Sequence, residues 1–550
     1  MEYFKDKVVY QIYLKSFKDS NQDGIGDLRG IIEKLDYLEV LGVDYLWITP
    51  FFVSPQNDNG YDIADYLNID PRFGTMEDLD ELIAETDKRG MGLMLDMVFN
   101  HTSTHHAWFQ RALAGDSEYM DYYIFKDGRS DRLPTNWESK FGGPAWKYAG
   151  HLKKWYLHLF HVEQADLNWD NPKVREELKK IIRFWKEKGV RGFRFDVVNL
   201  ISKPEVFADD NCGDGRRFYT DGHRVHEYLK ELVRDTGIEE MITVGEMSST
   251  TVENCIRYSN PEEQELSMCF NFHHLKVDYR NGDKWELMKP DLMALKKLYI
   301  KWQIEMQEHN GWNALFLCNH DQPRAISRFG NDGEYWKESA KMLAVSIFLQ
   351  RGTPYIYQGE ELGMTNAYFS DIEQYRDVES RNYYKILLEK GKSKAEAIQT
   401  LAARSRDNGR TPMQWNEEMF AGFSKHMPWI PVPDNYQKIN AMEEEKDPDS
   451  ILNFYKQLIQ FRKSRKALRE GNIAFLYEEH PDVLGYVRYC DGNEIIVLCN
   501  LRKKCVELKE AFEHCKYVLG NYEKVEIGVE GLRLREYECV VLEKRIGAIH

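Results

Sequence analysis

Three short segments of the chain each carry one carboxylate at the end of an apolar run: Asp196, Glu246 and Asp321. The segments are GFRFDVVN at 192–199, TVGEMS at 243–248 and FLCNHDQ at 316–322. Cleavage of a glycosidic bond with retention of configuration needs one carboxylate as nucleophile and one protonated carboxyl as acid. A third carboxylate can hold the sugar and stabilise the oxocarbenium-like transition state. The three segments therefore predict a glycosidase.

The elements that must position these carboxylates are short apolar strands separated by amphipathic helical patterns. Such helical patterns occur at 76–89, 171–188 and 335–349. The alternation predicts an α/β fold, a TIM (β/α)8 barrel, whose active site lies at the C-terminal ends of the strands. All three carboxylates fall at such ends. The expected strands are 8–13, 45–50, 92–99, 192–198, 242–247, 266–272, 314–320 and 353–358.

Two further regions interrupt or follow the predicted barrel. The third strand ends at Asn100 and the fourth begins only near Gly192, a gap too long for one helix and a turn. The inserted region is rich in aromatic and polar side chains, which favours a subdomain that covers the active site. From about Gly471 alternating strand-like stretches predict a β-sandwich. The expected division is a barrel at 1–100 and 168–470, an inserted subdomain at 101–167 and a C-terminal β-sandwich domain at 471–550.

Composition excludes several classes of partner. The net charge of −16 would repel nucleic acid or an anionic membrane surface. The N-terminal sequence lacks the order of a signal peptide, and no apolar run is long enough to cross a bilayer, so a cytoplasmic protein is expected. Nine cysteines without a CxxC pair indicate free thiols rather than disulfides or a zinc site.

Four motifs, DMVFNH, GFRFDVVN, GEM and NHDQ, occur in an order that resembles the α-amylase superfamily of retaining glycoside hydrolases, over essentially the whole chain. The resemblance implies that Asp196 is the nucleophile, Glu246 the acid/base and Asp321 the transition-state stabiliser. It also implies sugar contacts from His101 and His320, and it places Arg194 beside the nucleophile.

The physics of these residues supports the implied roles. Arg194 lies two positions before Asp196 on a strand, so both side chains share one face and the guanidinium should keep the nucleophile ionised. Glu246 must instead start protonated, which requires a raised pKa.

Other residues resemble those that close the sugar pocket in exo-acting members. Tyr61 and Asp62 in GYDIADY, with Arg410 in DNGRTPMQW, resemble the set that grips the terminal hydroxyls of one glucose. This predicts a pocket rather than an open cleft, although the Asp and Arg could instead be an ordinary ion pair between loops. Phe141 and Gln164 are further candidates for contact with the substrate.

The loop DSNQDGIGD at 19–27 places oxygen-bearing side chains at alternate positions, as a loop that binds a hard cation does. It departs from an EF-hand, because a strand precedes it and Gly30 stands where a bidentate Glu would be. The resemblance implies a structural Ca²⁺, or Mg²⁺, and a metal-free turn stabilised by Asp and Asn side chains is the alternative. No organic cofactor is expected. The implied ligands are Asp19, Asn21, Asp23, Asp27 and the carbonyl of Ile25.

The choice of substrate depends on a basic segment. QADLNWDNP and Val197 resemble the oligo-1,6-glucosidase group, and the stretches 214–229, 245–255 and 267–279 are most similar to its trehalose-6-phosphate hydrolases. Where oligo-1,6-glucosidases carry a pattern resembling FEHMDLD, this chain reads FHHLKVDY. His273 and Lys276 replace two carboxylates of that pattern, which favours binding of a dianionic phosphoryl group. The candidate phosphate ligands are His273, His274 and Lys276, with Arg280 and Lys284 as reserves.

The expected reaction is hydrolysis of trehalose 6-phosphate to glucose and glucose 6-phosphate by double displacement. The alternative is an isomaltase that acts on unphosphorylated α-1,6-glucosides. Sucrose isomerisation is disfavoured by RAISRF at 324–329, and a transporter-binding subunit is disfavoured because the carboxylates are kept and no membrane anchor is seen. The partner is a small phosphorylated disaccharide. The oligomeric state is open, with a monomer favoured.

Overall fold

A computed structural model describes residues 3–510, 512, 514–528 and 531–545. The eight predicted strands form one parallel sheet, in the order β13-β12-β11-β5-β2-β1-β15-β14. A parallel bridge between Cys269 and Asn313 joins the two ends of this sheet, so the barrel closes and the predicted fold class is confirmed. The strands are β1 (Val9–Ile12), β2 (Tyr45–Ile48), β5 (Gly92–Met97), β11 (Gly192–Phe195), β12 (Ile242–Glu246), β13 (Met268–Phe270), β14 (Ala314–Leu315) and β15 (Thr353–Tyr357).

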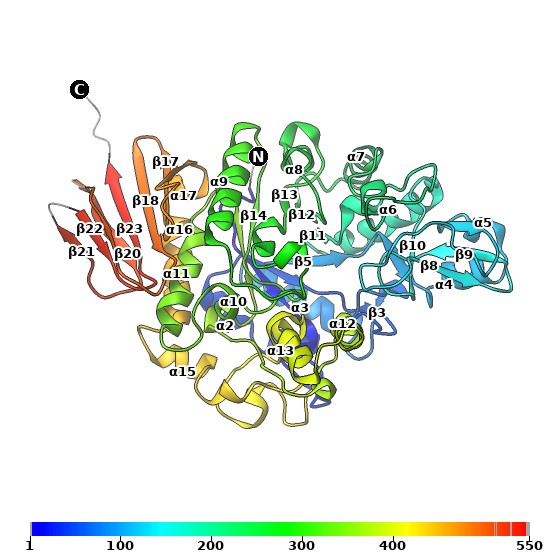
Figure 1. Cartoon of the computed structure of the whole chain (residues 1–550), viewed down its shortest axis with the longest axis horizontal. Coiled ribbons are helices and arrows are strands. Elements are labelled where there is room, and N and C mark those ends of the chain that lie inside the picture. The colour runs from blue at the N-terminus through cyan, green and yellow to red at the C-terminus, as the bar shows by residue number, and fades with distance from the viewer. Residues whose placement is uncertain (1–2, 511, 513, 529–530, 546–550) are drawn as a thin grey trace.

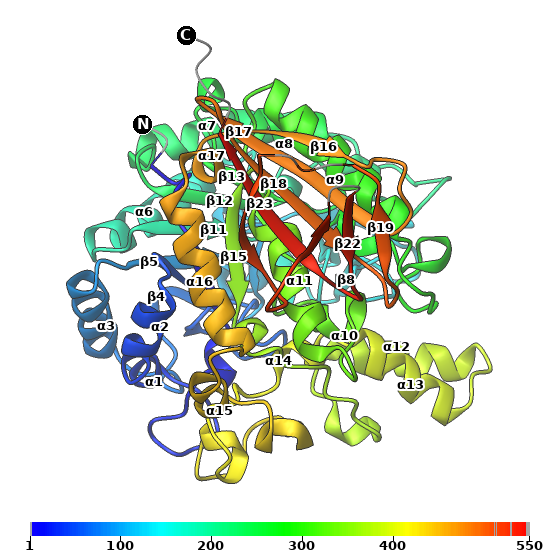
Figure 2. The same cartoon turned by 90° about the vertical axis from the view of Figure 1, so that its left-hand side faces the viewer.

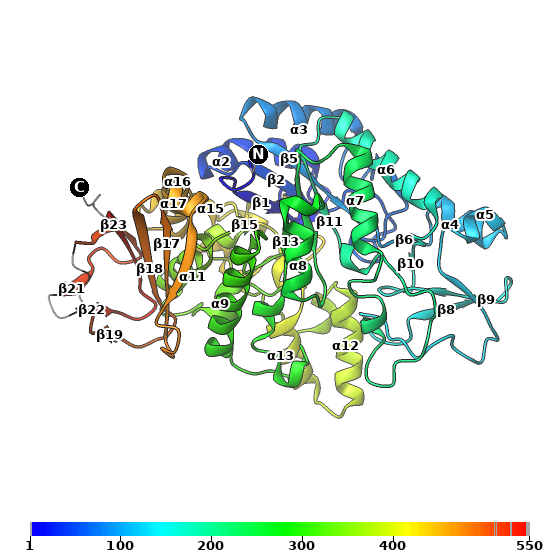
Figure 3. The ribbon, with the colours of Figure 1, turned by 90° about the horizontal axis from the view of Figure 1, so that it is seen from above.

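Helices surround the barrel, as the view from above shows (Figure 3). Helix α6 illustrates why they form. Asn171 caps its N-terminus by accepting a hydrogen bond from the backbone of Lys173, and Pro172 occupies the first turn, where no N–H is needed. Its buried side chains recur at helical spacing, which turns one face toward the sheet. The longer barrel helices are α3 (Met76–Lys88), α6 (Pro172–Glu187), α7 (Val225–Thr236), α8 (Val252–Ser259), α9 (Leu292–Glu308), α11 (Trp336–Phe348) and α16 (Ile451–Ser464).

Two of the strands are much shorter than predicted. The runs predicted at 266–272 and 314–320 shrink to β13 and β14, because the chain leaves the ladder while its side chains are still buried. Beyond β14 this departure carries His320 and Asp321 to the top of the barrel.

The inserted region forms a lobe at the end of the molecule opposite the C-terminal domain (Figure 1). Its base is closed where β10 pairs antiparallel with β6, in a register that places Asp166 opposite His101. Trp137 and Trp146 of the lobe pack with Val197 and Leu200 of the barrel loop after β11. The lobe thus packs beside the loop that carries Asp196. Its elements are β6 (His101–Ser103), α4 (Ala107–Leu113), α5 (Ser117–Met120), β7 (Phe125–Asp127), β8 (Trp146–Ala149), β9 (Lys154–Leu157) and β10 (Gln164–Asp166).

The C-terminal region contains two antiparallel sheets that share an apolar core, as a β-sandwich does. Val483, Leu498 and Val540 of the larger sheet pack with Leu508 and Leu534 of the smaller sheet. We keep the predicted domain boundaries as a proposal. The larger sheet contains β16 (Asn472–Leu476), β17 (Val483–Cys490), β18 (Asn493–Asn500), β23 (Cys539–Arg545) and β20 (Lys516–Gly520), and the smaller contains β19 (Val506–Leu508), β22 (Gly531–Leu534) and β21 (Glu526–Gly528).

A helical hairpin that the sequence patterns did not predict projects from the barrel after β15 (Figure 2). It consists of α12 (Val378–Glu389) and α13 (Lys394–Arg404), which bury Leu387 and Leu401 in a small core of their own. Asp377 precedes the first of these helices and Arg406 follows the second. Among the described residues, no helix has the length and apolar character needed to span a membrane.

Candidate active site

A cavity of about 250 Å³ brings the three predicted carboxylates together. Asp196 lies just beyond the end of β11 and Glu246 ends β12, while Asp321 lies on the loop beyond β14. These three segments reach one cavity because parallel strands of a barrel present their C-terminal ends at the same face. Tyr61, His101, Phe141, Lys276 and Lys284, all predicted substrate contacts, also line the cavity.

The turn after β11 aims Asp196 into this cavity through a strained backbone. The backbone N–H of Asp196 donates to the carbonyl of Met97 at 3.0 Å, which holds the end of the strand against β5. Val197 then adopts φ 34° and ψ 39°, in the left-handed region that a β-branched residue disfavours. Strain of this kind persists only where the surrounding packing imposes it, and here Val197 is packed beneath the lobe.

Arg194 links the nucleophile candidate to the acid/base candidate. Its Nη1 donates to Asp196 Oδ1 at 2.7 Å and to Asp96 Oδ1 at 2.6 Å, and its Nη2 donates to Glu246. The predicted contact between Arg194 and Asp196 is therefore present. The protonation state of Glu246 stays a prediction.

Asp96 is a site residue that the sequence analysis missed. It is buried on β5, and it also accepts hydrogen bonds from Trp47 Nε1 at 3.1 Å and from Tyr61 OH at 2.9 Å. Burial raises its pKa, although Arg194 acts in the opposite direction. One acid inside the otherwise apolar run GLMLDM was the signal that could have identified it.

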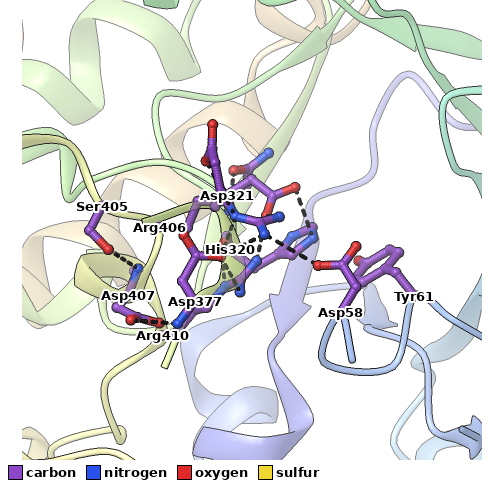
Figure 4. Close-up of polar contacts among 12 residues, drawn as sticks. Asp58, Tyr61, His320, Asp321, Asp377, Ser405, Arg406, Asp407 and Arg410 are labelled. Atoms are coloured by element: carbon purple, nitrogen blue, oxygen red, sulfur yellow. Dashed lines mark hydrogen bonds and ion pairs between the residues drawn. The ribbon is translucent and has the colours of Figure 1, made fainter. Parts of the chain in front are cut away.

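Asp321 lies against two guanidinium groups and one imidazole ring (Figure 4). Its Oδ1 accepts from Arg410 Nη2 at 2.7 Å and from Arg406 Nη1 at 3.2 Å, and His320 Nε2 lies 3.4 Å from Oδ2. Burial alone would raise the pKa of Asp321, but these neighbours hold it well below its usual value. An anion at this position can stabilise developing positive charge on a sugar and is not a source of protons.

His320 is held as a neutral imidazole. Gln11 Nε2 donates to His320 Nδ1 at 2.7 Å, which leaves the proton on Nε2. The ring stacks on Tyr61 with centroids 5.1 Å apart. Burial, with the charges of Arg194 and Arg410, lowers the pKa of His320 to about 3 despite Asp321. Nε2 is buried and has no hydrogen-bond partner within the described part of the chain, and His320 is not among the residues that line the cavity, so its predicted contact with the sugar stays a prediction.

The predicted pair of Asp62 and Arg410 is not formed. Asp62 is fully buried and accepts from Ser54 Oγ at 2.9 Å and from the backbone N–H of Asn57 at 2.8 Å, so it stabilises the loop behind the cavity. Arg410 instead donates to Asp321 and, through Nε, to the carbonyl of His320 at 2.8 Å. Both side chains therefore support the cavity without pairing with each other.

An acid–arginine pair is formed instead by the residues four positions before Asp62 and four positions before Arg410. Asp58 and Arg406 line the cavity and form an ion pair of 3.2 Å. Burial raises the pKa of Asp58 to about 7, against the effect of Arg406. Asp377 anchors Arg406 through Nε at 2.9 Å, and the guanidinium lies 4.9 Å from the centroid of the Phe141 ring. This wall closes one end of the cavity, as a pocket for a terminal sugar requires.

Gln164 does not line the cavity. It lies behind the wall, where its Nε2 is 3.2 Å from both Asp58 Oδ2 and His101 Nε2. His101 does line the cavity, but its Nε2 is also held at 3.0 Å from the carbonyl of Tyr61. Gln164 thus contacts Asp58 and His101 from behind the wall.

A model of the α-amylase catalytic domain matches residues 11–471. The chain belongs to the α-amylase family. Trehalose-6-phosphate hydrolase of Escherichia coli (strain K12) is 51% identical over 542 residues, 98% of each chain, and oligo-1,6-glucosidase of Bacillus cereus is 44% identical over 554 residues, 98% of this chain and 99% of that one. A crystal structure of Bacillus licheniformis trehalose-6-phosphate hydrolase, a mutant form in complex with PNG, has a TM-score of 0.96 and 51% identity, with 98% of this chain and 99% of that one covered.

Only part of the predicted basic set reaches the cavity of this α-amylase family member. Lys276, on the short helix η5 (His273–Lys276), lines the cavity, and so does Lys284, which forms an ion pair of 2.6 Å with Glu379. The two predicted imidazoles do not line it. His273 Nε2 lies 2.8 Å from the carbonyl of Thr250, and His274 Nε2 lies 2.8 Å from that of Phe316.

The helix η5 turns the rings of His273 and His274 away from the cavity. His274 packs in the core, and burial lowers its pKa to about 4, so it is neutral at pH 7. Arg280 lies outside the cavity and donates to the carbonyl of Leu287 at 3.2 Å. Lys140, which no sequence pattern indicated, reaches the same cavity from the lobe.

The predicted metal loop is closed by its own hydrogen bonds. Asp19 accepts from the backbone of Gln22 and Gly24, and Asp27 accepts from the backbone of Ser20 at 2.9 Å. Both carboxylates are buried, and neither forms an ion pair with another described residue. Across the described ranges, no three His, Cys, Asp or Glu side chains are arranged as ligands of one metal ion. The oxygen donors suit a hard cation, so metal binding stays a prediction.

Proposed function

We propose that the protein is a retaining α-glucosidase that hydrolyses trehalose 6-phosphate to glucose and glucose 6-phosphate. One observation carries the proposal: a single cavity joins the three carboxylates to Lys276, whose ammonium group forms no ion pair with any residue that the structure describes. An unpaired cation beside a glycosidase site suits a sugar that carries a phosphoryl group. The relatives named trehalose-6-phosphate hydrolase support this choice of substrate.

The reaction proceeds in two displacements. Asp196 attacks the anomeric carbon while Glu246 gives its proton to the departing oxygen of glucose 6-phosphate, so a glucosyl ester forms as the glycosidic bond breaks. Glu246, now a carboxylate, takes a proton from water. The water oxygen attacks the anomeric carbon, releases Asp196 and leaves glucose in the α configuration.

Other residues in the cavity and behind its wall act on the bound sugar. Asp321 stabilises the positive charge that develops on the ring, because its arginine neighbours keep it ionised. The free N–H of His320 donates to a hydroxyl of the same sugar. Asp58 and Arg406 grip the terminal hydroxyls and prevent a longer chain from passing, so cleavage starts at the non-reducing end.

The direct test compares glucose release from trehalose 6-phosphate and from isomaltose, with the Asp196→Asn variant as the blank. Turnover of the phosphate ester alone supports the proposal. Turnover of isomaltose alone would contradict it and establish an oligo-1,6-glucosidase with the same catalytic carboxylates, the activity named for relatives that are 42–45% identical to this chain.

Replacement of Lys276 by Asp should impair the phosphorylated substrate selectively. We expect KM for trehalose 6-phosphate to rise on the order of 100-fold, because an attraction becomes a repulsion at the cavity. KM for p-nitrophenyl α-glucoside, which carries no phosphate, should change less than about threefold. Steady-state kinetics on both substrates measure this. Lys289→Asp is the matched control, since Lys289 is exposed and lies outside the cavity. Equal losses on the two substrates would contradict the assignment.

We also propose that the loop at 19–27 binds Ca²⁺ through Asp19, Asn21, Asp23, Asp27 and the carbonyl of Ile25. The two buried carboxylates without a cationic partner support it. Ca²⁺ at 100 times its Kd should stabilise the fold by about 2.7 kcal/mol. Melting curves in EDTA and in Ca²⁺ measure this, and Asp19→Asn should remove the difference. Identical curves for the unmodified protein would refute the metal site.

The cellular location and the oligomeric state of the enzyme are also proposals. We propose a cytoplasmic monomer that acts on a small-molecule substrate. Light scattering of the purified protein tests the oligomeric state.

A further inference from the structure

Lys140 belongs to the lobe and Lys276 to the barrel segment after β13, and both line the same cavity. The backbone N–H of Lys140 donates to the carbonyl of Leu159 at 2.8 Å, which fixes the loop. Its ammonium group lies 5.4 Å from the centroid of the Tyr219 ring. No hydrogen bond or ion pair to this ammonium group is formed by the part of the chain that the structure describes.

The ammonium groups of Lys140 and Lys276 reach one cavity, and neither forms an ion pair with another described residue. Burial, Arg216 and Lys276 lower the pKa of Lys140 to about 8, and Asp214 only partly offsets them. Lys276 is an exposed residue that lines the same cavity. Asp214 is the nearest acid that acts on Lys140, but it accepts from Arg216 Nε at 2.9 Å through both oxygens. Both ammonium groups thus face one cavity, and an anion bound between them would offset their mutual repulsion.

We propose that Lys140 and Lys276 form a two-armed clamp for the phosphoryl group of the leaving sugar, so that Lys140 is a specificity-determining residue. This inference rests on the proposed function and deepens it. A phosphate monoester presents three strong acceptor oxygens, enough for both ammonium groups at once. Lys284 differs, because Glu379 already balances its charge. Asp214 likewise balances the charge of Arg216, so the two lysines are the uncompensated cations here.

The clamp also joins two parts of the molecule. Lys140 belongs to the inserted lobe and Lys276 to the loop after β13, so a bound phosphoryl group bridges the lobe and the barrel across the cavity. Loss of either arm should therefore weaken binding of the phosphorylated sugar and leave the glucose pocket intact.

Lys140→Met removes the charge and keeps an apolar stem of similar length. We expect kcat/KM for trehalose 6-phosphate to fall roughly 10- to 100-fold. The value for p-nitrophenyl α-glucoside should stay within about twofold, and Lys140→Arg should recover most of the loss. Lys147→Met is the matched control, because Lys147 is exposed on β8 of the same lobe and does not line the cavity.

Product inhibition tests the clamp without turnover of the phosphate ester. With p-nitrophenyl α-glucoside as substrate, Ki for glucose 6-phosphate should rise in Lys140→Met by the same factor, while Ki for glucose stays unchanged. Both constants come from one folded protein, so a general loss of stability cannot imitate their ratio. An unchanged ratio, or equal loss on both substrates, would overturn the clamp. Absence of trehalose 6-phosphate hydrolysis by the unmodified enzyme would instead overturn the proposed function.

Discussion

Asp196→Asn should reduce kcat on trehalose 6-phosphate and on p-nitrophenyl α-glucoside by at least about 10⁴-fold, because no other group can form the glucosyl ester. The loss should be equal on the two substrates, since both deliver the same glucosyl group to Asp196. Stopped assays over hours, with discontinuous detection of glucose, measure the residual rate.

The fold should survive this change. Arg194 would still donate to Asp96 at 2.6 Å and contact Glu246, so the buried guanidinium keeps anionic partners. The melting temperature is therefore expected to stay within a few degrees of the parent value. Asp127→Asn, an identical chemical change on an exposed carboxylate of the lobe, should leave kcat unaltered. Residual activity above about 1% of the parent would contradict the assignment of the nucleophile.

Glu246→Gln should reduce kcat differently on the two substrates, whereas Asp196→Asn should reduce it equally on both. Departure of a sugar alkoxide needs a proton, so we expect kcat on trehalose 6-phosphate to fall roughly 10²- to 10⁴-fold. p-Nitrophenolate leaves without a proton, so the glucosyl ester should form and then accumulate, because the base for the second step is missing. A burst of p-nitrophenol in rapid mixing would report this accumulation.

Sodium azide gives the decisive control for this variant. As an anionic nucleophile it needs no base, so it should accelerate turnover of p-nitrophenyl α-glucoside and yield α-glucosyl azide. Asp321→Asn should show no such rescue, because Asp321 stabilises the transition state and moves no proton. Rescue of Asp321→Asn in place of Glu246→Gln would exchange the two roles.

The different charge environments of Asp321 and Asp196 follow from their neighbours. Asp321 faces His320, Arg406 and Arg410, which outweigh the effect of burial and hold its pKa low. Asp196 contacts the same guanidinium as Asp96. One cavity thus holds an anion surrounded by arginines, Asp321, beside two carboxylates that share Arg194, namely Asp196 and Glu246.

Loop and helix geometry explains the positions that sequence reasoning placed wrongly. In NDNGYD the acid that faces the cavity is Asp58, whereas Asp62 points into the loop, and in RDNGR the residue that lines the cavity is Arg406 rather than Arg410. An irregular backbone has no fixed period, so the pattern of residues cannot say which of two acids four positions apart faces inward. The same limit applies to His274, which η5 turns into the core.

The sequence by itself determined the barrel, the sandwich and the meeting of Asp196, Glu246 and Asp321. Each strand has a local apolar pattern, and the closure of a parallel barrel forces all strand ends to one face. Only the tertiary structure decided which residues complete the site. Lys140 comes from the lobe and Arg406 from the end of a hairpin beyond β15, and contacts between such distant segments depend on how separate elements pack, which no local pattern encodes.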